Sequence, residues 1–370
     1  MKKEELKVNQ EEAYYLASQW KLMWRKLTKH KLAILGGVIL FILYFLAIFC
    51  EFFSVYDIHK RRTEYILCQP QRIHFFDQEG NFYLRPFVYG LKRTRDPKTW
   101  RRIYTEDKLK EYPIYFFVRG DEYRLWNLFP LDVYFLGVKE GVLFLFGTDK
   151  LGRDLFSRNL YASRISLSIG FVGVALSFVL GSLLGGISGY FGGTADMIIQ
   201  RVIEFLICIP TIPLWMALSA ILPATWSPIK IYFGITIILA IVAWCGLARV
   251  VRGKLLELRE EDFTVAAKIS GATDGRIIIK HLLPSFLSYL IVSVSLSIPN
   301  MILGETVLSF LGLGLRAPAV SWGTLLQDAQ DMQSVALHSW LLIPALFVII
   351  VVLAFNFLGD GLRDAADPYK

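Results

Sequence analysis

One uncharged stretch limits the possible folds of this chain more than any other feature. Residues 165–195 contain no Asp, Glu, Lys or Arg, whereas about 20 helical residues are enough to cross the ~30 Å hydrocarbon core of a bilayer. Only 19% of the 370 residues are charged and 54% are hydrophobic, compared with about 25% charged in a typical soluble domain. We therefore predict an all-α polytopic membrane protein.

Further apolar runs bring the expected number of transmembrane helices to six. They cover residues 32–55, 202–222, 231–248, 286–303 and 340–358. The 202–222 run is broken by Pro210 and Pro213, and the 286–303 run contains Pro299. Because a broken helix in a membrane usually lines a cavity or packs against protein, we take these prolines as candidates to line a cavity or pathway within the membrane. Glu305, which follows the 286–303 run, is a further candidate.

Basic residues set the expected orientation. Residues 1–31 are basic, and Trp20 and Trp24 share a helical face there, as in a helix lying at the headgroup level. No removable signal peptide is expected. The 249–285 loop holds seven Lys and Arg residues, whereas two short loops predicted outside hold only Lys230 and Arg316. The positive-inside rule then places both termini and this loop in the cytoplasm. The net charge of +8 follows this topology, and no nucleic-acid partner is expected.

Residues 56–146 differ from the rest of the chain. They are rich in aromatic and charged residues, and they contain no run long enough to span a bilayer. Alternating side chains at 114–118 and 131–135 predict strands. We expect a small mixed insert outside the membrane after the first span, and leave open whether it is a platform for a binding protein, a gate or a spacer.

Residues 262–284 form a long polar interruption between two apolar runs. Phe263, Ala266, Ala267 and Ser270 recur at helical spacing and predict a short helix with a face of mostly small side chains. Gly271 permits a turn, Thr273 is expected to cap a second short helix, and Pro284 is expected to end it. The predicted shape is helix, hinge, helix and stop, with Leu283 and Pro284 as the closing pair.

This stretch resembles the cytoplasmic EAA loop of membrane subunits of binding-protein-dependent ABC importers. Ala266, Ala267, Gly271, Leu283 and Pro284 match that pattern in identity and spacing. Val265 replaces the family's Glu and His281 replaces its Ile, which puts in doubt any ion pair made by that Glu. The resemblance implies a coupling helix, docked in a groove of an ATPase subunit, with contacts from Phe263 and Ser270 as well.

A second motif resembles the dipeptide, oligopeptide and nickel branch of these importers. Its residues are Gly147, Thr148, Asp149, Gly152, Arg153 and Asp154. Thr148 and Asp149 are expected to bond nearby amides, and Arg153 is expected to pair with Asp154. Residues 304–326 and 356–368 resemble two further stretches of the same branch. Spacing alone leaves open whether the 147–154 motif is an ordered elbow or a substrate contact.

The resemblance implies a type I ABC importer fold, with residues 147–370 as a five-helix permease core. Its implied partners are two ATPase subunits that bind ATP and Mg, a second homologous permease subunit, an extracytoplasmic substrate-binding protein and membrane lipid. Because the chain has no phosphate-binding loop of its own, ATP hydrolysis is assigned to the partners and no cofactor to this chain. The expected location is a bacterial or archaeal cytoplasmic membrane.

Several functional alternatives remain at this level. The leading substrate class is peptides, with oligosaccharides or nickel as alternatives. No catalytic or metal site is assigned, although His59 and His74 share the insert. An intramembrane enzyme would use Arg201, Glu204 and Glu305 as convergent polar groups. An ion-driven carrier would show inverted repeats with midplane charges, which are not evident in the sequence.

Overall fold

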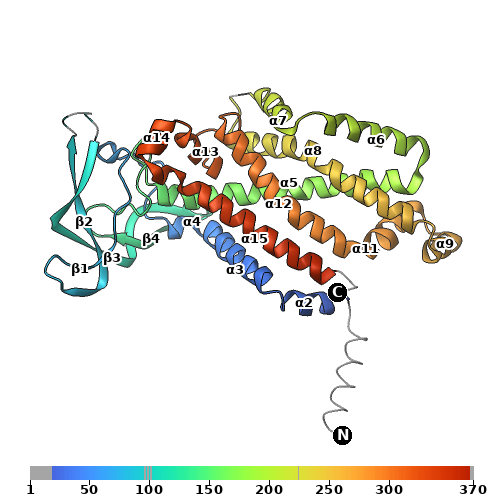
Figure 1. The fold of residues 1–370 in the computed structure, drawn as a ribbon, viewed down its shortest axis with the longest axis horizontal. Coiled ribbons are helices and arrows are strands. Elements are labelled where there is room, and N and C mark those ends of the chain that lie inside the picture. The colour runs from blue at the N-terminus through green and yellow to red at the C-terminus, as the bar shows by residue number, and fades with distance from the viewer. Residues whose placement is uncertain (1–18, 96, 98–99, 101, 224, 367–370) are drawn as a thin grey trace, which may run out of the picture.

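The computed structural model describes residues 19–366 except 96, 98–99, 101 and 224. The described molecule is elongated. A small β-sheet lies at one end and the loop containing α9 (Asp262–Ile269) lies at the other, with a bundle of long helices between them (Figure 1). The end of the predicted 356–368 motif and the side chain of Trp20 lie outside the described residues.

Five helical segments in the described chain are long and apolar enough to cross a membrane. Four are α3 (Lys31–Ile48), α5 (Leu155–Phe191), α8 (Pro228–Leu258) and α12 (Leu287–Phe310). The fifth joins η4 (Ser339–Leu342) to α15 (Ile343–Ala366). The basic N-terminal segment contributes α2 (Gln19–Leu27), whose Trp24 is exposed. Each of these spans overlaps one of the predicted apolar runs, although α3 ends at Ile48, before the predicted end of the first span at residue 55.

The predicted broken run forms two helices, α6 (Gly193–Cys208) and α7 (Thr211–Ala220), that meet at 91°. Ile209 has an extended backbone, as expected for a residue before proline, and Pro210 precedes the first residue of α7. Pro213 lies in the first turn of α7, where its missing amide costs no helical hydrogen bond. The two prolines are therefore placed at the break that they predicted.

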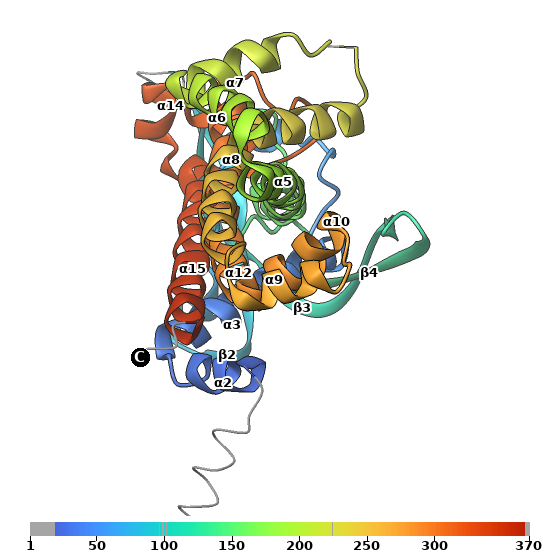
Figure 2. The same ribbon diagram turned by 90° about the vertical axis from the view of Figure 1, so that its right-hand side faces the viewer.

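Helix α5 forms the centre of the bundle, beside α8 and α12 (Figure 2). Glycines permit its close contact with α8, since a Cβ atom on Gly185 would lie 2.5 Å from the carbonyl oxygen of Ala248. Helix α3 approaches α15 in the same way at Gly36, where a Cβ atom would lie 2.5 Å from the oxygen of Ala354. Small residues thus set the helix spacing.

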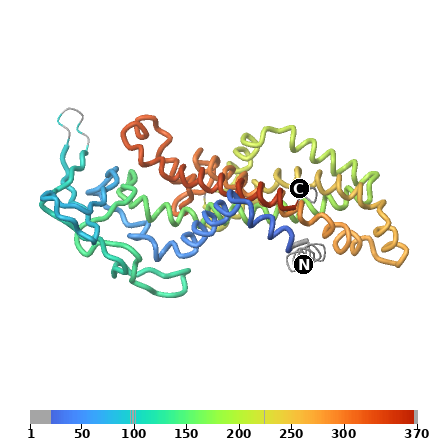
Figure 3. The backbone as a smooth tube through the Cα atoms, turned by 60° about the horizontal axis from the view of Figure 1, so that its bottom comes forward, coloured from blue at the N-terminus to red at the C-terminus, as the bar shows by residue number. Residues whose placement is uncertain are grey.

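The insert contains a four-stranded antiparallel sheet in the order β1 (His74–Phe76), β2 (Phe82–Arg95), β3 (Arg102–Leu125) and β4 (Phe129–Val138). Both predicted strands are confirmed, within β3 and β4. The first half of β3 pairs with β2, and its second half, from Ile114 onward, pairs with β4. The β3–β4 hairpin therefore extends away from β1 and β2 (Figure 3).

Short helices complete the described chain. Helix α4 (Cys50–Phe53) follows α3, and η1 (Thr63–Tyr65) precedes the sheet. Between α12 and α15 lie α13 (Trp322–Leu326), η3 (Gln327–Ala329) and α14 (Met332–Leu337). Side chains from the start of α5, from α12 and from α13 meet in one hydrophobic core that includes Leu155, Leu308 and Trp322.

Candidate functional site

The loop between α8 and α12 forms the end of the bundle opposite the sheet (Figure 1). It contains α9, α10 (Asp274–Arg276), the π-helical turn η2 (Ile277–Leu282) and α11 (Leu283–Ser285). Ile277 and Leu282 are fully buried against Val251 and Leu255 of α8. The loop is thus built onto the bundle by its own hydrophobic core.

Helix α9 exposes an apolar face. Ile269 is 82% exposed, and Phe263 and Val265 are 42% and 46% exposed. Of the small residues predicted to form the contact face, Ala266 is exposed and Ala267 is half-buried. In the described chain, the eight-residue helix α9 thus exposes three large apolar side chains. An exposed apolar patch of this kind is typical of a docking surface. Val265 and Ile269 were not among the residues predicted for this face, although both lie beside the small residues on the helix.

Two hydrogen bonds hold α9 and α10 to the long helices. The Thr264 hydroxyl donates to the carbonyl oxygen of Leu258 at 2.8 Å, at the end of α8. The Tyr190 hydroxyl, at the end of α5, donates to Asp274 Oδ1 at 2.7 Å. A cavity of about 620 Å³ separates the end of α5 from α9, and Lys268 lines it. A displacement of α9 would therefore act directly on α8, and on α5 through α10.

The predicted hinge at Gly271 is present, with a φ of +82° that L residues with side chains rarely adopt. Ser270 lies just beyond α9 as its C-cap, and its hydroxyl donates to the oxygen of Ala266 at 2.8 Å. Thr273 occupies the predicted N-cap position with an extended backbone, but its side chain makes no capping hydrogen bond. The backbone turn was thus predicted more accurately than the side-chain cap.

The prediction that Pro284 ends the second short helix is wrong. Pro284 lies within α11, and the helical path continues to Ser285 before Phe286 interrupts it. In an α-helix the proline ring would clash with the carbonyl group four residues earlier. Here the amide of Leu283 donates to the oxygen of Ile278, five residues earlier, so the chain is wound more widely just before the proline.

The 147–154 motif is organised around the buried carboxylate of Asp149. Its Oδ1 accepts hydrogen bonds from the amides of Leu151 at 2.8 Å and Arg153 at 2.9 Å. Its Oδ2 accepts from Arg153 Nε at 2.7 Å and also from the Arg158 guanidinium. The predicted pairing of Arg153 with Asp154 is wrong, because Arg153 pairs with Asp149 and Asp154 has another partner.

Asp154 is the N-cap of α5, and its Oδ2 accepts the amide of Ser157 at 2.8 Å. The side chain is 1% exposed, and this burial raises the pKa of Asp154 to about 6. Asp154 therefore starts the helix, as short polar side chains commonly do, but does so with a carboxyl group that is costly to ionise.

The rest of the motif binds the chain that leads into the sheet. The Thr148 hydroxyl accepts the amide of Cys68 at 2.8 Å and donates to the oxygen of Tyr65. A Cβ atom on Gly147 would lie 2.5 Å from the oxygen of Cys68, and one on Gly152 would overlap the oxygen of Arg62. Both glycines also have positive φ values. The geometry supports the ordered elbow and shows no exposed substrate contact in Asp149.

Two of the candidate pathway residues are enclosed by protein in this conformation. Glu305 is fully buried on α12, where its carboxylate accepts from Ser321 at 2.6 Å and Ser309 at 2.7 Å. Pro299 is buried in the same helix, whereas Pro210 and Pro213 are exposed in the described chain. Glu305 therefore holds α13 against α12 and lines no open surface here.

The convergent polar site required by the intramembrane enzyme is not formed. Arg201 Nη1 binds Glu204 Oε2 at 2.7 Å within α6, and both side chains are exposed. Glu305 instead lies among serines, including Ser166 of α5 at 3.3 Å. Among the described residues, no group of three His, Cys, Asp or Glu side chains could hold a metal ion.

Two ion pairs between distant segments were not predicted. Arg252 of α8 binds Asp196 of α6 through two hydrogen bonds of 2.5 and 2.6 Å. Ser188 of α5 donates to the same carboxylate at 2.5 Å, which joins three helices near the α9 end of the bundle. At the other end, Arg164 of α5 binds Glu51 of α4 at 2.6 Å. All four charged residues lie in or beside apolar runs, where an unpaired charge is costly. The two members of each pair are too distant in sequence for the pairing to be predicted.

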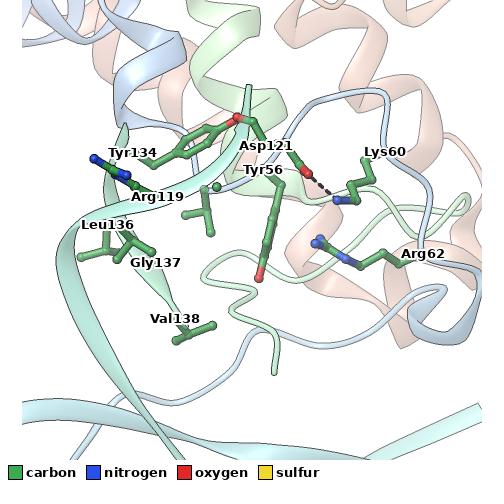
Figure 4. A pocket seen from close by; sticks show the side chains of 12 residues that line it. Tyr56, Lys60, Arg62, Arg119, Asp121, Tyr134, Leu136, Gly137 and Val138 are labelled. Atoms are coloured by element: carbon green, nitrogen blue, oxygen red, sulfur yellow. Dashed lines mark hydrogen bonds and ion pairs between the residues drawn. The ribbon is translucent and has the colours of Figure 1, made fainter. Parts of the chain in front are cut away.

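The insert has a small cavity of about 170 Å³ between the chain after α4 and the β3–β4 hairpin (Figure 4). Lys60 Nζ binds Asp121 Oδ2 at 2.6 Å across it. The Arg62 guanidinium lies over the ring of Tyr56, 3.6 Å from the centroid. The Lys60–Asp121 pair links the hairpin to the start of the insert, whereas the Arg62–Tyr56 contact lies within that starting segment.

Sequence comparison identifies the family. Residues 142–369 match the family described as binding-protein-dependent transport system inner membrane component. The chain belongs to this family. Residues 18–70 also match the N-terminal TM domain of oligopeptide transport permease C, so both matches together leave most of the insert unmatched.

Named relatives cover the same part of the chain. The oligopeptide transport system permease protein OppC of Haemophilus influenzae is 44% identical over 60% of this chain and 70% of its own length. The dipeptide transport system permease protein DppC of Bacillus subtilis is 40% identical over 60% of this chain and 68% of its own. Among solved structures, the inward-facing MetNI methionine ABC transporter covers 54% of this chain and 93% of that chain, with 19% identity and a TM-score of 0.44, too low a similarity to support an argument about this protein.

Proposed function

We propose that this chain is a permease subunit of an ATP-driven importer and forms half of a translocation pathway for di- and oligopeptides. The family assignment, together with relatives named as oligopeptide and dipeptide permeases, supports this function. A binding protein outside the membrane delivers the peptide, and a second permease subunit of similar fold completes the pathway. No observation on this chain favours nickel or oligosaccharides over peptides.

The exposed face of α9 carries the proposal, because it provides the contact through which a separate ATPase subunit can act. Phe263, Val265 and Ile269 form the apolar part of this face, and Ala266 allows close approach. The hydrogen bond from Thr264 to α8, and the bond between α10 and α5, link this contact to the membrane-spanning helices. Binding and hydrolysis of ATP with Mg in the partner then shifts the bundle between inward- and outward-facing states.

Six spans with both termini in the cytoplasm are part of this proposal. Helix α2, which precedes the first span, lies against the end of α15, and His30 Nε2 is 3.8 Å from Asp364 Oδ2. The start of the first span and the end of the last span are therefore on the same side of the bundle. An even number of crossings satisfies this contact, and the α6–α7 pair supplies the sixth.

The substitution Ala267→Glu tests the ATPase contact. It places a charge beside the exposed face, and we expect loss of both peptide uptake and stimulated ATP hydrolysis, with normal amounts of the chain in the membrane. Ala267→Ser is the matched control, because it preserves the small size and should retain both activities. Unchanged uptake and ATPase stimulation in the Glu variant would contradict the proposed role of α9.

A further inference from the structure

The β3–β4 hairpin turns back from the sheet beside α4, toward the end of the first span (Figure 3). Aromatic rings attach its base to α4: the Phe53 and Phe135 ring centroids are 5.2 Å apart, and those of Phe52 and Phe117 are 6.2 Å apart. The Lys60–Asp121 pair adds a polar contact nearer the tip. The position of the hairpin beside the bundle is therefore defined by several independent contacts.

Two donors show how far the tip reaches along the first span. Trp126 Nε1 donates to the carbonyl oxygen of Ile48, the last residue of α3, at 2.8 Å. Arg164 donates to the same oxygen at 2.7 Å and is paired with Glu51. The 18 residues of α3 extend about 27 Å at ~1.5 Å per residue, close to the ~30 Å of a bilayer core. Ile48 and its charged neighbours thus mark the membrane boundary on the sheet side, and Trp126 lies at that level.

The tip is unusually apolar for a turn. Turns are commonly built from Gly, Pro, Asn, Asp and Ser, but here the exposed residues around Asn127 are mainly hydrophobic. Leu128 is 71% exposed, Phe129 is 55% exposed, and Leu131 and Trp126 are 39% and 43% exposed. Trp side chains are enriched at membrane interfaces, where the ring lies among apolar groups and its N–H is bonded.

The exposed surface of the tip continues onto the exposed surface of α3. The ring of Trp126 lies 5.5 Å from that of Phe49, and Phe49 lies 5.0 Å from Phe45. Phe45 and Phe41 are 45% and 71% exposed on the span itself, where lipid is the surrounding medium. Lipid therefore also surrounds the side of the tip that faces α3.

We propose that the tip of the β3–β4 hairpin, residues 125–131, inserts into the headgroup and upper acyl region of the outer leaflet. Leu128, Phe129 and Leu131 occupy the apolar layer, Trp126 lies at the boundary, and the exposed Arg124 remains at the lipid phosphates. The hairpin is then a membrane anchor that fixes the insert relative to the bilayer. This proposal requires the chain to span a membrane and does not depend on the transported substrate.

Probes at two exposed leucines test this anchor in the full-length protein. Cys208, the exposed cysteine among the described residues, is replaced by Ser, and Leu128→Cys is labelled with an environment-sensitive fluorophore. Leu84→Cys is the matched control, because Leu84 is 88% exposed in β2, a strand at the far end of the molecule from α9 (Figure 1). Both variants are placed in nanodiscs of phosphatidylethanolamine and phosphatidylglycerol, without a binding protein.

We expect blue-shifted emission from the Leu128 probe, protection from aqueous iodide, and quenching by lipids that carry a nitroxide. A nitroxide close to the glycerol should quench more strongly than one at the methyl end of the chain, because interfacial groups penetrate only about 5–10 Å. The Leu84 probe should show the opposite pattern. Asn127→Cys provides a second tip position if Leu128→Cys is poorly produced.

Iodide quenching of the tip probe without nitroxide quenching would overturn the proposal. If this exposure disappears only when a binding protein is added, the tip is a protein-docking surface instead. A lipid-independent result would leave the proposed transport function intact, since uptake is measured separately.

Discussion

The start of α5 depends on the buried carboxylate of Asp149. Its carboxylate is 1% exposed and neutralises Arg158, which is itself buried. Removal of one partner from a buried ion pair leaves an uncompensated charge, at a cost of about 3–5 kcal/mol. We therefore predict that Asp149→Asn strongly lowers the apparent melting temperature of the detergent-solubilised protein.

The exposed Arg201–Glu204 pair provides a matched control for this prediction. Its side chains are 77% and 49% exposed, and a pair of this kind contributes about 0–1 kcal/mol. Arg201→Ala should therefore leave the melting temperature almost unchanged. Equal effects of the Asp149 and Arg201 substitutions would show that burial does not set the importance of these pairs.

Asp154 should make the folded protein less stable as the pH rises, as expected for a buried acid. Burial raises its pKa from 3.8 to about 6, so the folded protein holds the proton more tightly than the unfolded chain. Stability is greatest below the unfolded pKa and falls as the pH rises through the folded pKa, by about 3 kcal/mol for a shift of ~2 pH units.

Asp154→Asn tests this sign, because Asn preserves an N-cap acceptor without the charge. We expect the variant to melt above the wild type at about pH 8, with a gap that narrows toward about pH 5. Asp331→Asn is the contrast: hydrogen bonds from Ser334 and Gln333 lower the pKa of Asp331, so its contribution is lost as the pH falls. If the difference in melting temperature between Asp154→Asn and the wild type stays constant across this pH range, the raised pKa of Asp154 is contradicted.

The residue types at 147–154 were informative, but their partners were only partly predictable. Local bonding by Asp149 and Thr148 follows from the chemistry of short polar side chains near a turn. Pairing of Arg153 with its neighbour Asp154 was a reasonable expectation, yet Asp154 is used as the helix cap. The partners Cys68 of Thr148 and Arg158 of Asp149 are brought into place by the tertiary fold. The spacing of residues in the sequence does not predict them.

Among the elements, the α9 loop depends on the conformation of one glycine. A non-glycine residue in the left-handed region costs about 1–2 kcal/mol. Gly271 has a φ of +82°, and no atom lies within 4 Å of the position that a Cβ atom would take there. Gly271→Ala should therefore strain the turn without any clash. We expect reduced peptide uptake by the reconstituted assembly, with the chain still inserted in the membrane.

Gly275→Ala is the matched control, because Gly275 also has open space around it but lies in α10 without a positive φ. Alanine favours helix there, so uptake should be retained. A similar loss of peptide uptake in both variants would show that the size of the side chain, and not the backbone turn at Gly271, causes the effect.

Element positions were well predicted where apolar length or proline determines them. Pro210 predicted the break between α6 and α7, and side-chain alternation predicted β3 and β4. The wide turn before Pro284 was not predictable. It depends on the hydrogen bond from the amide of Leu283 to the oxygen of Ile278, five residues earlier, which forms only in the folded loop. Exposure of Ile269 also required the structure, since an apolar residue in a short helix is more often buried.

For the whole molecule, the contact between α2 and α15 limits the topology. Because these segments bracket all of the spans, their meeting favours an even number of crossings. The bent α6–α7 pair therefore determines the orientation of everything after it. A crossing pair places the α7–α8 connection on the sheet side and α9 on the opposite side, whereas a re-entrant pair reverses both positions.

Cysteine labelling distinguishes these two topologies in intact cells. In the Cys208→Ser background, we predict that Thr225→Cys reacts with a membrane-impermeant maleimide, whereas Glu260→Cys reacts only after the membrane is permeabilised. Both positions are exposed in the described chain, so burial within the bundle does not protect them. The reverse labelling pattern would place α9 outside, where no cytoplasmic ATPase could reach it, and would contradict the proposed six-span topology with a cytoplasmic N-terminus. Because the proposed coupling mechanism requires α9 in the cytoplasm, this single result tests the topology and the proposed site of energy input together.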